Sequence, residues 1–156
     1  MLYVVDTSSF IVLENYYPDT FPSFWEAWND LVDAGRIVSV SEAHRELDTN
    51  ATADFLFDWL EAHKGIFDPP TGDETAAVAE IFGVPHFQQL ISQKQRVKST
   101  PVADPWLVAR ALVRGGCVIT EEALKPNAAK IPNVCDHFGV DCTNPRGAFK
   151  REGWRY

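Results

Sequence analysis

The chain has 156 residues, of which 46% are apolar and 12% aromatic, and its formal net charge is −8. That much apolar side chain can bury a core, so we expect one globular domain over residues 1–156, and no stretch reaches the ~20 apolar residues of a membrane span. The negative charge argues against a protein that coats nucleic acid through a basic face, because binding of that kind relies on Lys and Arg.

The chain begins with a strand that two helices should follow. Residues 2–5 (LYVV) form a continuous apolar run, which is typical of a strand buried on both faces of a parallel sheet. We expect the next helix to be capped by Ser8 or Ser9. In FPSFWEAWNDLVDAG, Ser23 and Glu26 have the spacing of a capping box, and apolar residues recur at helical intervals. This segment therefore predicts a second helix.

The middle of the chain repeats the pattern of a strand followed by helices. RIVSV (36–40) predicts a second strand, and Ser39 with Glu42 has capping-box spacing for a helix over SEAHREL. DFLFDWLEAHKG and DETAAVAEIFG each place apolar residues on one helical face and end on glycine. We therefore expect three helices after the second strand.

The last third of the chain predicts the rest of the sheet. QLISQKQRVKSTP is polar and basic and predicts a loop. Asp104 at the capping position and Pro105 in the first turn predict the start of a helix over ADPWLVARALVRGG. The remaining expected elements are a strand over CVIT, a helix over IPNVCDHFG, a strand near 140–142 and a helix in NPRGAFKREGWRY. This alternation predicts an α/β fold, a three-layer α/β/α sandwich with a mostly parallel central sheet.

Cysteine usage and the N-terminus predict a cytoplasmic protein without a membrane partner. Asp6 interrupts the N-terminal apolar run too early for a signal peptide. Cys117, Cys135 and Cys142 are an odd number and lack the paired spacing of structural zinc sites, so we interpret them as reduced core residues.

Acidic residues stand where the predicted strands end or the predicted helices begin. Asp6 ends the first strand, Glu46 lies in the helix after the second, Asp104 begins a helix, and Glu121 and Glu122 follow CVIT. Ligands of open α/β sheets bind beyond the carboxyl ends of the strands, where helix N-termini also point, so all of these residues can face one cleft. Clustered carboxylates raise one another's pKa unless a cation neutralises them. Mg²⁺ or Mn²⁺ suits oxygen ligands and activates water for attack on phosphate, so we predict such a site here.

Four segments carry a resemblance to a known family. In chain order, VVDTSSFI, VSVSEAHREL, VADPWLVARAL and CVITEEA resemble the motifs of PIN-domain nucleases, and among them those of the VapC-like toxins of toxin–antitoxin pairs. KIPNVCDHFGVDC further resembles the C-terminal segment of a less characterised PIN subfamily. The resemblance implies a PIN-like fold and metal-dependent cleavage of RNA by water.

The resemblance also implies roles for single residues. Asp6, Glu46 and Asp104 match three catalytic metal ligands. At the fourth position the family commonly has Thr, one residue and Asp, whereas this chain has glutamates, of which spacing favours Glu122 with Glu121 as the alternative. The matching hydroxyl positions, which orient the first aspartate or contact phosphate, are Thr7, Ser8 and Thr120.

The basic residues of the loop before Asp104 are candidates for contact with the substrate backbone. They are Lys94, Arg96 and Lys98. Contacts of this kind position a nucleic acid without reading its bases. The alternative is an ordinary solvated loop.

Each acidic residue also has a purely structural interpretation. Asp6 and Asp104 could cap helices, and Glu46 could be a solvated helix residue. The ordered combination favours the functional interpretation over these separate ones.

The alternatives for the whole protein are a catalytically inactive PIN-like binding module and a phosphatase that uses Asp6 as its nucleophile. The phosphatase chemistry normally needs a second aspartate two residues later, where this chain has Ser8. The resemblance implies RNA as substrate, an antitoxin protein as partner, and a homodimer. Trp25 and Trp28 are most simply core residues, with such an interface as the alternative.

Overall fold

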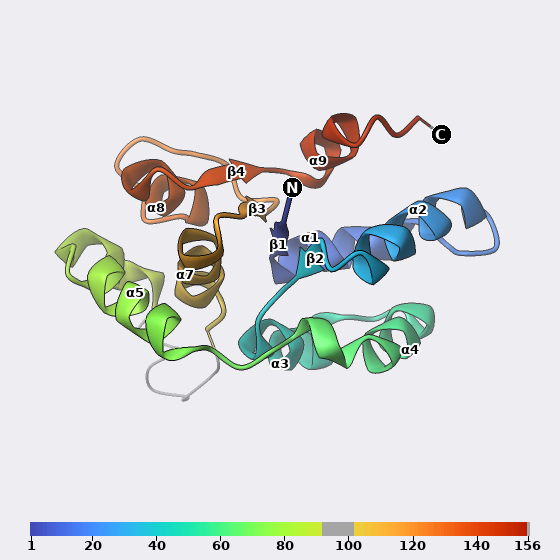
Figure 1. The fold of residues 1–156 in the computed structure, drawn as a ribbon, viewed down its shortest axis with the longest axis horizontal. Coiled ribbons are helices and arrows are strands. Elements are labelled where there is room, and N and C mark those ends of the chain that lie inside the picture. The colour runs from blue at the N-terminus through green and yellow to red at the C-terminus, as the bar shows by residue number, and fades with distance from the viewer. Residues whose placement is uncertain (92–101, 156) are drawn as a thin grey trace.

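Four short parallel strands form the centre of the computed structural model, which describes residues 1–91 and 102–155 (Figure 1). The strands are β1 (Tyr3–Val5), β2 (Ile37–Val38), β3 (Cys117–Ile119) and β4 (Asp141–Thr143). Their order in the sheet is β2-β1-β3-β4, and Val4 of β1 lies opposite both Val38 and Val118. The parallel pairing confirms the predicted α/β class.

Helices cover both faces of this sheet. The α-helices (α) and 3₁₀ helices (η) of the described residues are α1 (Thr7–Val12), η1 (Leu13–Asn15), α2 (Pro22–Asp33), α3 (Ser41–Asn50), α4 (Asp54–Ala62), η2 (Lys64–Ile66), α5 (Gly72–Phe82), η3 (Pro85–Leu90), α7 (Asp104–Arg114), α8 (Ile131–Phe138) and α9 (Pro145–Arg151). β2 lies on one side of β1 in the sheet and β3 lies on the other. Because crossover connections between parallel strands are right-handed, connections that lead in opposite directions place their helices on opposite faces of the sheet. In Figure 1, α7 and α8 lie on one side of β1 and β3, and α1 and α2 lie on the other. This arrangement confirms the three-layer sandwich.

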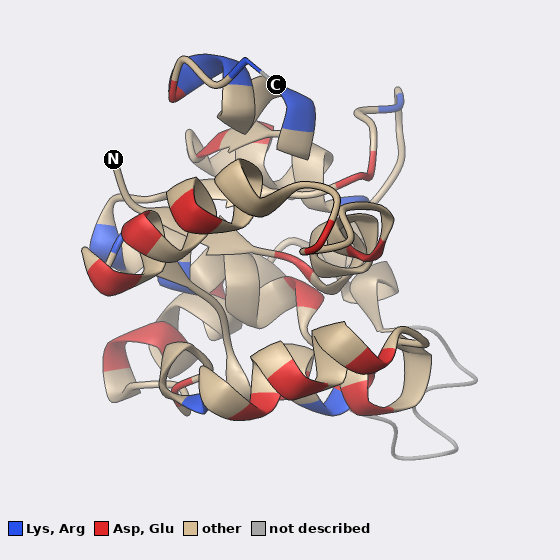
Figure 2. Cartoon of the chain, turned by 90° about the vertical axis from the view of Figure 1, so that its right-hand side faces the viewer, with Lys and Arg blue, Asp and Glu red and all other residues tan. Residues whose placement is uncertain are grey.

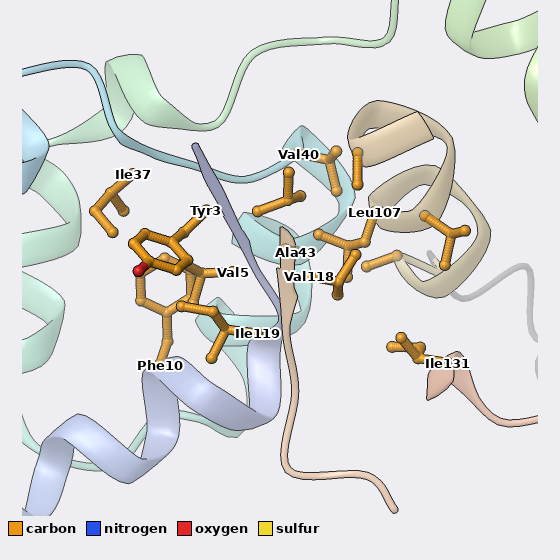
Figure 3. Packing of buried hydrophobic residues seen from close by; sticks show 14 of the residues in the cluster. Tyr3, Val5, Phe10, Ile37, Val40, Ala43, Leu107, Val118, Ile119 and Ile131 are labelled. Atoms are coloured by element: carbon orange, nitrogen blue, oxygen red, sulfur yellow. The ribbon is translucent and has the colours of Figure 1, made fainter. Parts of the chain in front are cut away.

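The apolar residues of the two central strands pack against helices in both directions. Val4 and Val118 have 0% of their surface exposed. Figure 3 shows Val118 lying toward Leu107 of α7, whereas its neighbour Ile119 lies toward Phe10 of α1. Strands covered on both faces need no polar alternation, which explains their continuous apolar sequence.

Trp25 and Trp28 of α2 are core residues. Their exposed fractions are 6% and 3%. Trp25 meets Phe24 edge to face, with ring centroids 5.6 Å apart, and Trp28 meets Phe10 in the same way at 6.4 Å. The alternative that these tryptophans form an interface is therefore wrong.

Two of the predicted helix starts are displaced. α2 begins at Pro22 with Phe21 as the N-cap, so Ser23 already lies inside the helix. α3 begins at Ser41 after Val40, and the Ser39 hydroxyl donates to the carbonyl of Val5 at 2.7 Å instead of capping a helix. The capping boxes expected at Ser23 and Ser39 are therefore wrong.

A capping box that was not predicted lies at the start of α5. Thr71 accepts a hydrogen bond from the backbone N–H of Glu74, and the Glu74 carboxylate accepts one from the backbone N–H of Thr71. This pair fixes the start of α5, the helix that packs against α7.

A buried ion pair holds α7 in place. Arg110 of α7 has no exposed surface, and its Nε and Nη2 atoms each donate to the Glu74 carboxylate at 2.9 Å. The same guanidinium also donates to the backbone carbonyls of Ser39, Asp68 and Pro69. Because every one of these partners belongs to another segment, Arg110 fixes the position of the helix whose first residue is Asp104.

In the described part of the chain, the helices are too short or too polar to cross a membrane. Cys117 and Cys135 are buried free cysteines and Cys142 is a half-buried one. The first two are core residues, as predicted.

Candidate active site

The edge of the sheet where β1 and β3 end is the place where the strand order reverses. β2 and β3 follow β1 in the chain but lie on opposite sides of it. Open α/β sheets bind their ligands at such a switch point, beyond the carboxyl ends of the strands. Asp6 directly follows β1 and Thr120 directly follows β3, and the backbone N–H of Asp6 donates to the Ile119 carbonyl at 2.9 Å. The sheet register thus places Asp6 at the switch point.

The Asp6 carboxylate is buried and held by two hydroxyl groups. Only 4% of the residue is exposed. Its Oδ2 atom accepts hydrogen bonds from Ser8 Oγ and Thr120 Oγ1, both at 2.8 Å. Asp6 occupies the N-cap position of α1, but its side chain makes no capping hydrogen bond. The expectation that Ser8 or Ser9 caps this helix is therefore wrong, and the Asp6 carboxylate points into the site rather than to the helix backbone.

Glu46 connects three elements around this point. Its Oε2 atom accepts from Thr7 Oγ1 of α1 at 2.6 Å, and its Oε1 atom accepts from the backbone N–H of Ala103 at 2.9 Å. Ala103 is the N-cap residue of α7, and alanine has no side chain that could serve as a cap. Glu46 is therefore half-buried and bound on both oxygens, and its interpretation as a solvated helix residue is wrong.

Asp104 is the first residue of α7 and not its cap, so the predicted capping role is wrong. The half-buried side chain lines a cavity of about 370 Å³. The other residues that line this cavity are Gln89, Leu90, Glu122, Ala128, Ala129 and Lys130. Among the described residues, no side chain or backbone group hydrogen-bonds to the Asp104 carboxylate. The carboxylate therefore faces a space large enough for a ligand.

Of the two candidate glutamates after β3, Glu122 is the one beside Asp104. Glu122 is half-buried, lines the same cavity, and accepts a hydrogen bond from the backbone N–H of Ile131 at 2.8 Å. Glu121 is exposed and lines a neighbouring hollow instead, while its backbone N–H donates to Ser8 Oγ at 3.2 Å. The structure thus favours Glu122 for the fourth position.

The pKa of Asp104 shows how closely the acidic residues gather. Burial raises this pKa from 3.8 to about 8, and the negative charges of Asp6, Glu122 and Glu46 add to the effect. The ammonium of Lys130 acts in the opposite direction. Three acidic residues from separate parts of the chain therefore act electrostatically on Asp104, in agreement with the predicted convergence.

The pKa of Asp6 is raised less. Burial brings it from 3.8 to about 6, while the hydrogen bonds from Ser8 and Thr120 lower it because they favour the charged form. The charges of Glu122 and Glu46 raise it further. Asp6 is thus largely ionised at neutral pH, whereas Asp104 largely keeps its proton unless a cation lies nearby.

Residues 3–156 match the model of a family described as a domain of unknown function, DUF4411. The chain belongs to this family. The matched range includes all the acidic residues of the site. No curated protein matches the chain. The family description names no activity, so the PIN-like nuclease function of this DUF4411 chain stays a prediction.

The donor atoms of the DUF4411 site fit Mg²⁺ or Mn²⁺ in their chemistry, because all of them are carboxylate oxygens. The raised pKa values of Asp6 and Asp104 reflect burial and repulsion from neighbouring carboxylates, and a bound cation would reduce that repulsion. Yet among residues 1–91 and 102–155, no three Asp, Glu, His or Cys side chains are arranged to hold a metal ion. Glu46 and Glu122 instead turn carboxylate oxygens toward backbone N–H groups. Among the described residues, Asp104 is the one of these four carboxylates that accepts no hydrogen bond.

The predicted hydroxyl residues of the DUF4411 chain contact carboxylates. Ser8 and Thr120 bind Asp6, and Thr7 binds Glu46. Thr120 also accepts from the backbone N–H of Glu122 at 3.1 Å. These contacts agree with the predicted role of orienting the acidic residues. The other predicted substrate contacts, Lys94, Arg96 and Lys98, lie outside the described residues.

Sequence reasoning missed Lys130, which lies on the wall of the cavity beside Asp104 and Glu122. Its only signal in the sequence is its place directly before the helix over IPNVCDHFG. The turn from Glu121 to Lys130 brings it back to the switch point, and no local pattern predicts the path of that turn.

Proposed function

We propose that this chain hydrolyses RNA phosphodiester bonds with Mg²⁺ or Mn²⁺ bound at the switch point of the sheet. The observation that supports this function is the pair of carboxylates, Asp6 and Asp104, which are both largely buried and have raised pKa values, with the charge of Asp6 contributing to the shift of Asp104. The order of the acidic motifs along the chain supports the same proposal.

In the proposed reaction, water attacks phosphorus and the bond from phosphorus to the leaving ribose oxygen breaks. The attacking water loses a proton to solvent, and the leaving ribose oxygen takes one up from solvent. Asp6 and Asp104 would hold the cation, and the hydrogen bonds from Ser8 and Thr120 favour the ionised form of Asp6 and fix the orientation of its carboxylate. A bound divalent cation supplies an activated water and neutralises charge on the phosphate. Glu122 lines the cavity beside Asp104 and would complete the site, whereas Glu46 keeps the start of α7 in position.

The direct test compares RNA cleavage by the wild type and by Asp6→Asn in Mn²⁺. Loss of one ligand at nearly constant shape should lower the rate by at least ~100-fold. Asp58→Asn, which changes an exposed aspartate of α4, is the matched control and should cut RNA at the wild-type rate. Equal cleavage by Asp6→Asn and the wild type would refute the assignment of the site.

The proposal extends to the biological role that the resemblance implies, a cytoplasmic toxin that forms a homodimer and is neutralised by an antitoxin protein. Expression of the wild type should then arrest growth, and the product of a neighbouring gene should relieve the arrest. Asp6→Asn should cause no arrest. If the wild type is harmless but cleaves RNA in vitro, the toxin role is wrong and the nuclease remains.

A second candidate function is a binding module without catalysis. The observation in its favour is that Glu46 and Glu122 bind backbone N–H groups instead of standing open for a metal. Calorimetric titration with Mn²⁺ separates the two functions. The nuclease should show a site that disappears in Asp104→Asn, whereas the binding module should show no such site.

A further inference from the structure

Lys130 is held at the cavity by its place at the start of α8. It is the N-cap residue of that helix, and its carbonyl accepts from the backbone N–H of Val134 at 3.0 Å. The next residue, Ile131, donates its backbone N–H to the Glu122 carboxylate at 2.8 Å. This bond fastens the backbone beside Lys130 to Glu122, so the lysine side chain starts from the wall of the cavity that Asp104 also lines.

The ammonium of Lys130 is available to a ligand. Within the part of the chain that the structure describes, it forms no ion pair of 4.0 Å or less, whereas Arg110 and Arg151 pair with Glu74 and Asp141. Lys130 is exposed, and it is the only basic residue among those described as lining this cavity. Because the Lys130 ammonium is not paired with a carboxylate of the described residues, it can attract an anionic ligand to the cavity that Asp104 and Glu122 line.

The negative charge of the protein means that an anionic ligand needs a nearby positive group to bind in this cavity. Figure 2 shows acidic residues spread over many helices, while a group of basic ones gathers on the C-terminal helix. With a net charge of −8, the protein as a whole repels a polyanion. The cavity beside Asp104 also has the carboxylate of Glu122 on its wall. A phosphate that enters this cavity therefore needs a positive contact at short range.

We propose that Lys130 binds a phosphate group of a nucleic acid strand in the cavity beside Asp104. Lysine suits this role because its compact charge on a long flexible stem can reach a phosphate oxygen without a fixed geometry. The inference rests on the proposed function, since it assigns the contact to the substrate of the same site. The alternative is that Lys130 serves only as a counter-ion to Asp104 and Glu122.

The experiment measures binding of a fluorescein-labelled single-stranded RNA by anisotropy, in Ca²⁺ and over a series of salt concentrations. For a single strand, loss of one phosphate contact makes the plot of log affinity against log salt shallower by about 0.7. Lys130→Met should show this change and bind roughly tenfold more weakly at low salt. Lys130→Arg should restore both values, because it keeps the charge.

Lys125→Met is the matched control, since Lys125 is an exposed lysine of the same turn that does not line the cavity. It should keep the wild-type salt dependence, and all variants should melt at the same temperature. A salt dependence in Lys130→Met equal to that of the wild type would overturn the inference, as would a wild type that does not bind this RNA.

Cleavage in Mn²⁺, measured on the same preparations, separates this inference from the proposed function. If RNA is bound through Lys130 but is not cut, the phosphate contact stands and the nuclease is wrong. If RNA is cut while Lys130→Met binds with unchanged salt dependence, the nuclease stands and the contact is wrong.

Discussion

Replacing Asp104 by asparagine should stabilise the protein in the absence of divalent cations, although it removes a proposed ligand. The pKa of Asp104 is raised from 3.8 to about 8 by burial and by the neighbouring carboxylates. At pH 7 the folded protein therefore binds a proton that the unfolded chain has released, which costs about 4 kcal/mol at ~1.36 kcal/mol per pKa unit. The side chain is half-buried, and screening by solvent reduces this cost to about 2 kcal/mol. The asparagine side chain does not titrate, so Asp104→Asn avoids this cost.

The pH dependence has a definite sign. Because the folded state binds the extra proton, raising the pH favours unfolding, and the wild type should lose stability progressively between pH 4 and pH 8. Urea unfolding in EDTA at pH 5, 7 and 9 measures the effect. Asp104→Asn should gain about 2 kcal/mol over the wild type at pH 7, and the gain should shrink toward pH 4. Asp58→Asn on the exposed face of α4 should change little at any pH.

Divalent cations should reverse the order of stability. A ligand that binds only the folded state stabilises it by about 2.7 kcal/mol at 100 times its dissociation constant. Mn²⁺ should therefore stabilise the wild type and leave Asp104→Asn nearly unchanged. If Asp104→Asn were no more stable than the wild type in EDTA at pH 7, the carboxylates would not be gathered as described here.

Three further substitutions test the contacts that build the site. Glu46→Ala should lower the free energy of unfolding by about 2–4 kcal/mol in urea, because it removes two hydrogen bonds and leaves the Ala103 N–H unpaired; a loss under ~0.5 kcal/mol would contradict its role at the start of α7. Arg110→Met should cost about 3–5 kcal/mol in the same assay, since within the described chain it leaves the buried Glu74 carboxylate with only its longer ion pair to Arg114 at 3.4 Å, and a neutral result would contradict the role of the Arg110–Glu74 pair in holding α7. Thr120→Val should raise the pKa of Asp6 above about 6 in a carboxyl NMR titration, because a hydrogen bond that favours the charged form is lost; an unchanged titration would exclude that bond in solution.

The fold and the gathering of the acidic residues were predictable from local patterns. The continuous apolar run at 2–5 predicted a strand covered on both faces and CVIT predicted a further strand, and β1 and β3 are buried strands at these places. Once the sheet is parallel, its topology alone brings the residues that follow the strands to one edge. That is why Asp6 and Glu122 could be placed together although more than a hundred residues separate them.

The partners of single side chains were not predictable, because they depend on tertiary contacts. Ser39 has the spacing of a cap, yet burial beside β1 gives its hydroxyl the carbonyl of Val5 instead. Glu46 looks like any exposed helix glutamate in the sequence, and only the docking of α7 supplies its partner at Ala103. Lys130 reaches the site through an irregular turn that carries no periodic signal.

The most direct test of the central claim is the anomalous diffraction of a crystal of the full chain soaked in Mn²⁺. We expect a manganese peak between the carboxylates of Asp6 and Asp104, with ligand distances of about 2.1 Å and with Glu122 turned toward the ion. A peak at another place on the protein, or none in a crystal whose fold around these two residues is unchanged, would contradict the claim that they hold a divalent cation.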